Sequence, residues 1–228
     1  MSASTVTLFS GLALKDLYVH EILPESPDEV ETVFAPTSVL VSRIRAGDRP
    51  DILVGVRDPL RELAAESILD STTLRPLVRS GLGVATLPDA PAPALGSAEE
   101  FVSSLRSARS VAYSRSGASG LHFSALLERL GIAEEVNSRA TLVPGGFTGE
   151  ALLDGRADLA IQQVIELRSV DGIRIAGSFP DELQHYVDLW IGGSPRLSDS
   201  KAAERLWDIL VSPTAAAAYG AAGLEWSD

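Results

Sequence analysis

Two side chains in the middle of the sequence could move a proton to or from carbon. His122 stands three residues after Ser119, which we expect to cap the start of a helix. The positive end of a helix dipole favours a neutral imidazole, which can accept a proton from a carbon next to a carboxylate. Glu166 follows a pair of glutamines and is a second candidate acid or base. Packing or capping would explain His122 equally simply, and an exposed turn would explain Glu166, so the sequence leaves both choices open.

The residues that could hold an anion recur in one local pattern, in which an apolar strand leads through a turn of Ser, Thr or Gly into a helix. Glycine permits the sharp turn, a hydroxyl donates, and the free N–H groups at the helix start point at the ligand. Ordinary helix caps have the same composition. Several such turns are therefore stronger evidence for an anion site than any single turn. The pattern occurs at Ser10-Gly11, at Thr37-Ser38, from Ser116 to Gly120 and, more loosely, at Gly145-Gly146.

Other polar residues stand beside these turns. Lys15 could pair with a carboxylate, and a cation so early in a helix is mildly unfavourable, although a solvated position explains it as well. Gln162 and Gln163 offer donors and acceptors at a strand end, but neighbours on a strand face opposite ways, so we expect only one to meet a ligand. Arg57 and Arg115 could each clamp a carboxylate through two hydrogen bonds.

The elements that must position these residues alternate between strand and helix, which favours an α/β protein with largely parallel sheets. Ligands of such open sheets gather beyond the carboxyl ends of the strands, so the turns could meet around one pocket. The pattern predicts strands over 6–9, 31–35, 51–56, 81–87, 110–113, 140–143, 159–161, 172–176 and 186–191. It predicts helices over 15–23, 39–46, 60–67, 98–107, 121–130, 148–153, 201–210 and 213–220.

The composition argues against several classes of protein. A formal net charge of -12 over 228 residues makes nucleic acid and anionic membranes poor partners. The chain has no cysteine, which excludes disulfides, thiolate metal sites and cysteine nucleophiles. The three histidines lack metal-ligand spacing, and neither a phosphate-binding loop nor a dinucleotide motif occurs, so we expect no metal and no cofactor.

The sequence also carries signals about location. It has no apolar run of membrane-spanning length and no recognisable secretion leader or lipid-attachment cysteine. We therefore expect a native start and a cytoplasmic protein without membrane insertion. A leader trimmed from the chain would place it instead in the periplasm or at the cell surface.

The order and spacing of the turns resemble the type II periplasmic-binding-protein fold, and within it the molybdate-binding-protein family, over nearly the whole chain. The segments 35–40, 44–47 and 50–54 are the closest match and resemble the family's Ser-Ser-x-Leu, Ile-x-x-Gly and x-Ala-Asp-Val pattern. The segments 6–17, 153–159 and 213–224 resemble its opening strand and helix, its later Gly-x-Ala-Asp turn and its C-terminal helix.

The resemblance implies two lobes, each a mostly parallel sheet flanked by helices, joined by two crossing strands. One lobe would hold 1–80 plus 190–228 and the other 81–189, with the ligand cleft between the lobes and closure by hinge motion. The chain has Ala13 where the family places a serine and Gln163 where it places a tyrosine. The segments 119–123 and 161–166, together with Lys15, resemble a divergent branch that includes sequences similar to aconitate isomerase.

That branch implies a cofactor-independent isomerase on a solute-binding scaffold, which binds a small organic carboxylate and moves its double bond by proton transfer through His122 or Glu166. The alternative is the substrate-binding protein of an ABC-type importer for a molybdate-like oxyanion or an organic acid. A cytosolic ligand sensor is a weaker third option, since no DNA-binding segment accompanies it. In each case we expect the small anion to be held by Ser10, Gly11, Lys15, Thr37, Ser38, Ser116, Ser119, Gly120, Gly145, Gly146, Gln162 and Gln163.

Overall fold

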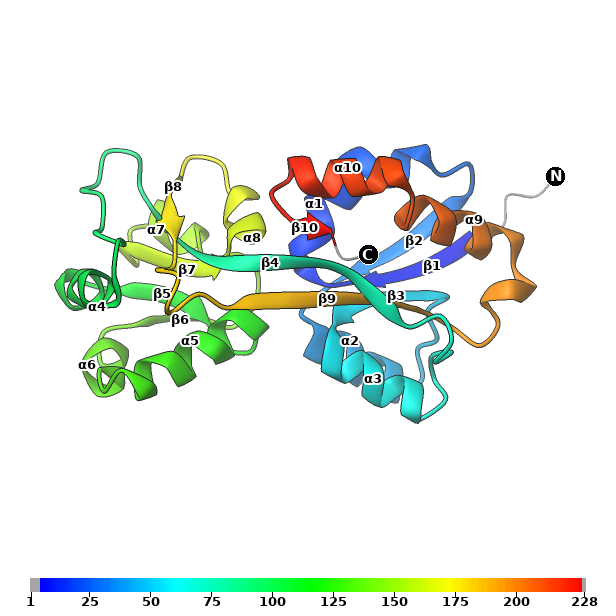
Figure 1. Ribbon diagram of the computed structural model, residues 1–228, viewed down its shortest axis with the longest axis horizontal. Coiled ribbons are helices and arrows are strands. Elements are labelled where there is room, and N and C mark those ends of the chain that lie inside the picture. Colours follow the sequence, from blue (N-terminus) through cyan, green and yellow to red (C-terminus); the bar gives the residue numbers. More distant parts are fainter. Residues whose placement is uncertain (1–4, 227–228) are drawn as a thin grey trace. The chain divides into compact units, whose positions relative to one another are not determined.

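The computed structural model describes residues 5–226. The chain divides into two compact units. The first unit contains the residues up to Arg79 and those from Asp188 onward, and the second unit is Ser80–Val187. The chain passes from one unit to the other in two strands, β4 (Arg75–Thr86) and β9 (Tyr186–Gly193), which can be followed in Figure 1.

The sheet of the first unit has the order β2-β1-β3-β9. β1 (Thr5–Ser10) lies between β2 (Glu29–Phe34) and β3 (Ile52–Val56), and all three are parallel. β9 pairs with β3 in the antiparallel direction, and the short β10 (Glu225–Trp226) pairs with the first half of β4. The three parallel strands therefore end at one edge of this sheet.

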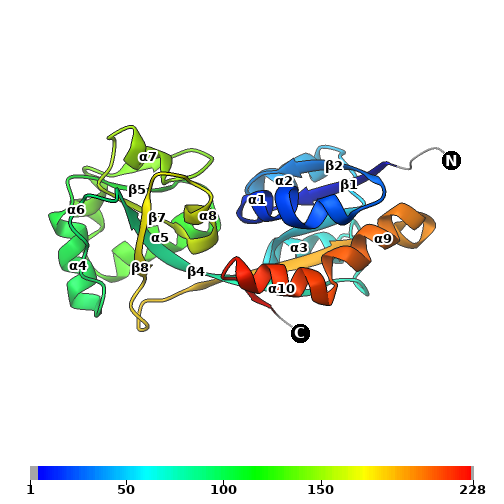
Figure 2. The same cartoon turned by 90° about the horizontal axis from the view of Figure 1, so that it is seen from above.

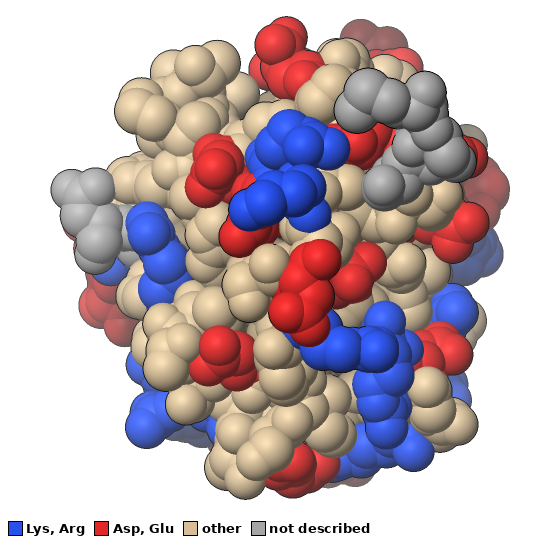
Figure 3. Space-filling view, turned by 90° about the vertical axis from the view of Figure 1, so that its right-hand side faces the viewer, with Lys and Arg blue, Asp and Glu red and all other residues tan. Residues whose placement is uncertain are grey.

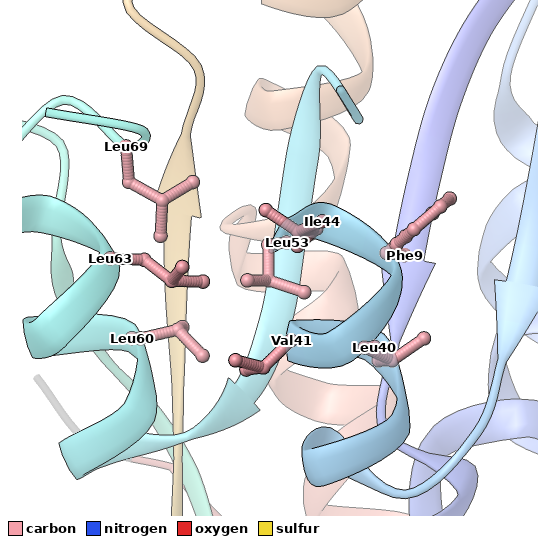
Figure 4. Close-up of a cluster of buried hydrophobic side chains, with 8 residues drawn as sticks. All are labelled: Phe9, Leu40, Val41, Ile44, Leu53, Leu60, Leu63 and Leu69. Carbon is pink, nitrogen blue, oxygen red and sulfur yellow. The ribbon is translucent and has the colours of Figure 1, made fainter. Parts of the chain in front are cut away.

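Helices cover both faces of this sheet. α2 (Thr37–Arg45) and α3 (Arg57–Ala65) lie on one face, and α9 (Lys201–Leu210) and α10 (Pro213–Ala221) lie on the other (Figure 1). Apolar residues three or four apart on α2 and α3 meet those of β1 and β3, and burying each large side chain contributes about 1.5–3 kcal/mol. Figure 4 shows the resulting cluster, which consists of Phe9, Leu40, Val41, Ile44, Leu53, Leu60, Leu63 and Leu69.

The helix expected over 15–23 is a composite of short turns. A 3-10 turn, Leu12–Leu14, precedes α1 (Lys15–Leu17), and a π turn, Tyr18–Ile22, leads into a second 3-10 turn, Leu23–Glu25. Pro24 within that last turn has no N–H to donate, so a regular α-helix cannot continue through it.

The sheet of the second unit has the order β4-β7-β5-β6. β5 (Val111–Ser114), β6 (Thr141–Val143) and β7 (Leu159–Gln163) are parallel, and β4 runs antiparallel between β7 and β8 (Arg174–Ser178). Here too the parallel strands end at a common edge.

The helices of the second unit again cover two faces. α5 (Ala118–Arg129) lies on one face, and α7 (Glu150–Leu153) and α8 (Val164–Arg168) lie on the other (Figure 1). Alanines on β4, β5 and β7 let α7 and α8 pack close to the sheet, in a cluster of Ala85, Ala112, Val143, Ala151, Leu152, Ala157, Ala160 and Leu167. α4 (Ala98–Ser107) lies beside α6 (Ala133–Asn137), as Figure 2 shows.

Charged residues of both signs are interleaved on the face that carries α9 (Figure 3). In the first unit, Arg205 pairs with Asp28 at 2.8 Å and Arg43 pairs with Asp48 at 2.7 Å. Both side chains of the Arg43–Asp48 pair are about half exposed, and pairs of this kind add little stability. Within residues 5–226, no helix has the length and apolar character needed to span a bilayer.

Candidate functional site

The predicted turns of the first unit come together at one edge of its sheet. The N–H of Ala35 donates to the carbonyl of Ser10 at 3.2 Å, and the N–H of Gly11 donates to the carbonyl of Val54 at 2.8 Å. These bonds join the ends of all three parallel strands. This is the edge at which open α/β sheets bind their ligands.

Internal hydrogen bonds already occupy several of these groups. The fully buried hydroxyl of Ser10 donates to the carbonyl of Gly11 at 3.3 Å, and the N–H of Gly11 is engaged as described. The hydroxyl of Thr37 accepts the N–H of Val56 at 3.1 Å. Ser38 is exposed in the first turn of α2, where N–H groups lack partners within the helix. Lys15 is exposed and follows a full 3-10 turn, so it does not stand in the first helical turn.

The turns of the second unit also converge. The N–H of Arg115 donates to the carbonyl of Val143 at 2.9 Å, which joins the ends of β5 and β6. Gln162, on β7, accepts the N–H of Thr148 at 2.7 Å and its hydroxyl at 3.0 Å, and its side-chain amide donates to the carbonyl of Gly146 at 3.3 Å. Gln162 therefore fixes the glycine loop after β6, which includes Gly145. The side chain of Gln163 is also engaged within the protein, since its amide donates to the carboxylate of Glu166 at 3.2 Å.

Replacing Thr148 by Val tests this anchor. Thr148 is fully buried, and Val keeps its shape and its backbone N–H but removes the hydroxyl, leaving the Gln162 oxygen with one partner fewer. We expect the free energy of unfolding in urea to fall by about 1–2 kcal/mol. Thr214→Val, at an exposed position of α10, should change it by less than about 0.5 kcal/mol. Equal effects of the two substitutions would contradict the assignment.

The start of α5 differs from the expectation. The helix begins at Ala118, and Gly117 is its N-cap; the hydroxyl of Ser114 accepts the N–H of Gly117 at 2.9 Å and turns the chain into the helix. Ser119 is consequently not the cap but a buried residue of the first turn. Gly120 is packed so tightly against the end of β5 that a Cβ there would overlap the carbonyl oxygen of Ser114. Ser116 is half-buried in the turn itself.

His122 lies in the second turn of α5 and is half-buried. Its ring stacks on that of His185, with centroids 3.8 Å apart and planes inclined by 7°. Burial, together with smaller electrostatic contributions from His185 and Arg129, lowers the pKa of His122 to about 4. The ring is therefore neutral at neutral pH, as the sequence predicted, but chiefly because of burial.

Glu166 is a buried residue of the first turn of α8. The alternative expectation, that it is an exposed turn residue, is therefore wrong. One of its carboxylate oxygens accepts the backbone N–H of Gln163 at 3.3 Å and its side-chain amide at 3.2 Å. Burial raises the pKa of Glu166 to about 7, although the hydrogen bonds from Gln163 and Gln162 act in the opposite direction. A carboxyl group with this pKa can both accept and donate a proton at neutral pH.

The two candidate proton carriers are on helices that cover opposite faces of the second sheet, α5 for His122 and α8 for Glu166 (Figure 1). The spacing Gln163-x-x-Glu166 is that of a residue that caps a helix and the acidic residue of its first turn, and this signal could have predicted α8. Within residues 5–226, no group of three or more His, Asp or Glu side chains is arranged to hold a metal ion.

The fold and sequence have known relatives. A Pseudomonas protein named aconitate isomerase is 31% identical over 186 residues, which are 81% of this chain and 70% of that protein. The periplasmic molybdate-binding protein of Azotobacter vinelandii superposes with a TM-score of 0.79 at 16% identity, covering 98% of this chain and 100% of that one. PEB3 of Campylobacter jejuni, bound to L-phospholactate, superposes with a TM-score of 0.68 at 16% identity, covering 97% and 100%.

These likenesses confirm the two-lobed type II periplasmic-binding-protein fold and the resemblance to a branch that contains aconitate isomerase. The sequence model described as "Bacterial extracellular solute-binding protein" matches residues 20–225, nearly the whole of the described chain. The chain therefore belongs to the bacterial extracellular solute-binding protein family.

Proposed function

We propose that this protein binds a small unsaturated carboxylate at the carboxyl ends of its strands and shifts the double bond by proton transfer, with Glu166 as acid and base. The observation that carries the proposal is the buried carboxyl of Glu166 in the first turn of α8, directly after β7, whose pKa of about 7 suits reversible proton transfer. The 31% identity to a protein named aconitate isomerase supports the same reaction.

The reaction needs no oxidant or reductant. Ionised Glu166 takes a proton from the carbon next to the double bond, and the electron pair of the broken C–H bond shifts through the allylic system. A carboxylate on the ligand stabilises the developing charge. Glu166 then returns the proton to the far carbon, so the double bond has moved by one position. His122 is the second candidate for this role, and its pKa of about 4 makes its neutral ring a much weaker base.

Each unit offers its own groups for ligand carboxylates. In the first unit, exposed Ser38 and the N–H groups of Thr37 and Ser38 at the start of α2 are available, and Lys15 is exposed as well. In the second unit, Ser116 and the first N–H groups of α5 lie beside the exposed loop of Gly145 and Gly146. We propose that these groups bind the carboxylates, whereas Ser10, Gly11, Thr37, Ser119, Gly120 and Gln162 shape the turns.

The second candidate function is the substrate-binding protein of an ABC-type importer for an organic acid or an oxyanion. The family to which the chain belongs favours it, as do the solved relatives that bind molybdate or L-phospholactate. In that case Glu166 only closes the first turn of α8. The two functions also differ in location, because we propose the isomerase for the cytoplasm and the receptor for the outer side of the membrane, and fractionation of the native cells distinguishes them.

One experiment with two readouts tests the proposal. The protein is incubated with cis- or trans-aconitate in deuterated water near neutral pH, and thermal unfolding is followed in parallel. We expect the ligand to raise Tm, since a ligand at 100 times its Kd adds about 2.7 kcal/mol, and NMR to detect deuterium bound to carbon together with the other isomer. A raised Tm without any exchange would favour the receptor, and neither effect with these acids would overturn aconitate as the ligand.

A further inference from the structure

A hollow of about 360 Å³ in the first unit is lined by residues of β4, β9, β10 and the start of α3. This volume is within the range of sites for small ligands. Six of its residues carry aromatic rings or charges, and the other three are apolar. The six are Arg57, Arg79, Asp188, Trp190, Glu225 and Trp226.

The four charged residues of this hollow form two ion pairs, and one of the two arginines has a further acidic partner next to it. Nε of Arg79 donates to the carboxylate of Glu225 at 2.7 Å. A guanidinium nitrogen of Arg57 lies 3.8 Å from the carboxylate of Asp188, and Nε of Arg57 also donates to its neighbour Asp58 at 2.9 Å. All four side chains are about half exposed. Pairs with this exposure contribute at most about 1 kcal/mol each, so a ligand that offers new partners can replace them.

The balance of charge selects the kind of ligand. A simple anion that contacts Arg79 also meets the carboxylate of Glu225, and a simple cation that contacts Glu225 meets the guanidinium of Arg79. A zwitterion with adjacent carboxylate and ammonium groups satisfies both members of a pair and leaves no charge unpaired. Guanidinium groups hold carboxylates through two parallel hydrogen bonds, which a free amino acid can accept.

The two indole rings give the hollow an apolar wall. Trp190 packs against the core of the first unit, and Trp226 stacks on Tyr219 with centroids 5.6 Å apart. Both rings are thus held by their own contacts. An indole face attracts an ammonium group and offers a large area to an apolar side chain.

We propose that this hollow binds an α-amino acid zwitterion with an apolar or aromatic side chain. Its carboxylate meets Arg79 or Arg57, its ammonium group meets Glu225 or Asp188, and its side chain lies against Trp190 and Trp226. This binding is separate from the proton transfer proposed above and does not depend on it.

Tryptophan fluorescence provides the test, because two of the three tryptophans of the chain line the hollow. L-phenylalanine, 3-phenylpropionate and phenethylamine share the phenyl ring, but 3-phenylpropionate lacks the ammonium group and phenethylamine lacks the carboxylate. We expect L-phenylalanine to give a saturable change with a Kd at least about tenfold lower than either analogue. Equal affinities, or no saturation by L-phenylalanine up to about 20 mM, would overturn the proposal.

Two variants give a readout that misfolding cannot imitate. Arg79→Gln leaves Glu225 without its cation and should shift the preference toward phenethylamine, whereas Glu225→Gln should shift it toward 3-phenylpropionate. Arg106→Gln breaks a similarly exposed pair, with Glu135, in the second unit and should leave the order unchanged. The same order of affinities in all four proteins would contradict the assignment.

Discussion

Glu166→Gln is expected to reduce isomerisation and deuterium exchange by about 10²–10⁴-fold, the usual contribution of a general acid–base residue. Gln has nearly the same shape as Glu and can still accept the N–H of Gln163, so the first turn of α8 should persist. Its amide does not titrate near neutral pH, so it cannot act as the acid or the base. Ligand affinity, measured by the rise in Tm, should stay within about threefold of the unmodified protein, which corresponds to about 0.7 kcal/mol, because the substitution is isosteric.

The matched control is Glu128→Gln, which removes an exposed carboxylate from α5 of the same unit. It should leave turnover unchanged. Full activity of Glu166→Gln would transfer the role to His122, and His122→Asn would then be the variant that loses exchange. If both variants lose affinity together with turnover, the assignment of either residue as the proton carrier fails.

The same substitution has a signature in stability that does not depend on any ligand. Because the pKa of Glu166 is raised from 4.5 to about 7, the folded protein holds this proton more tightly than the unfolded chain does. The associated stability is present below about pH 4.5 and is lost as pH rises toward 7, in total about 3 kcal/mol at 1.4 kcal/mol per pH unit. The Gln variant has no such loss. In urea unfolding, the free energy of unfolding of the variant should therefore rise relative to that of the unmodified protein between about pH 4.5 and pH 7. Parallel pH profiles would contradict a buried, proton-holding Glu166.

Gly120→Ala is expected to be the most damaging of the small substitutions, with a loss of about 3 kcal/mol or more in the free energy of unfolding. The added Cβ overlaps the carbonyl oxygen of Ser114, so α5 must move away from β5. That movement displaces the start of the helix and the half-buried Ser116, and ligand binding should weaken as well.

Gly220→Ala is the matched control, because Gly220 also lies in a helix, α10, and has open space around the position of a Cβ. Alanine is the better helix former, so this change should raise stability by about 0.5–1 kcal/mol. Opposite signs for the two glycines, read from the same urea unfolding experiment, would demonstrate the close approach of α5 to β5. Similar small effects would contradict it.

Elements with local capping signals could be predicted from the sequence. The expected helices over 98–107 and 201–210 have the bounds of α4 and α9, since Ser97 and Ser200 accept N–H groups of the first turn at 3.2 Å. The start of α5 could not be predicted in the same way, because the hydroxyl that turns the chain belongs to Ser114, a residue of the preceding strand. β4 is longer than expected because its first half pairs with strands from the last part of the sequence, β9 and β10.

The candidate site was predictable in its turns but not in its contacts. The Ser, Thr and Gly turns follow the parallel strands, and each unit brings its own turns together. The bond that commits Gln162 joins it to Thr148, fourteen positions away, and only the folded sheet makes them neighbours. The burial that sets the proton affinity of Glu166 comes from packing of α8 against the sheet, which the residues around it in the sequence do not encode.

The division of the chain also sets the order in which it can acquire structure on the ribosome. The second unit is one continuous stretch, whereas the first takes residues from both ends of the polypeptide. β9 completes the first sheet and β10 covers β4, and both are synthesised after the whole of 80–185. During translation, therefore, the second unit can finish folding before β9 and β10, which complete the pairing of the earlier strands, have been synthesised. The half that begins first is the half that is finished last.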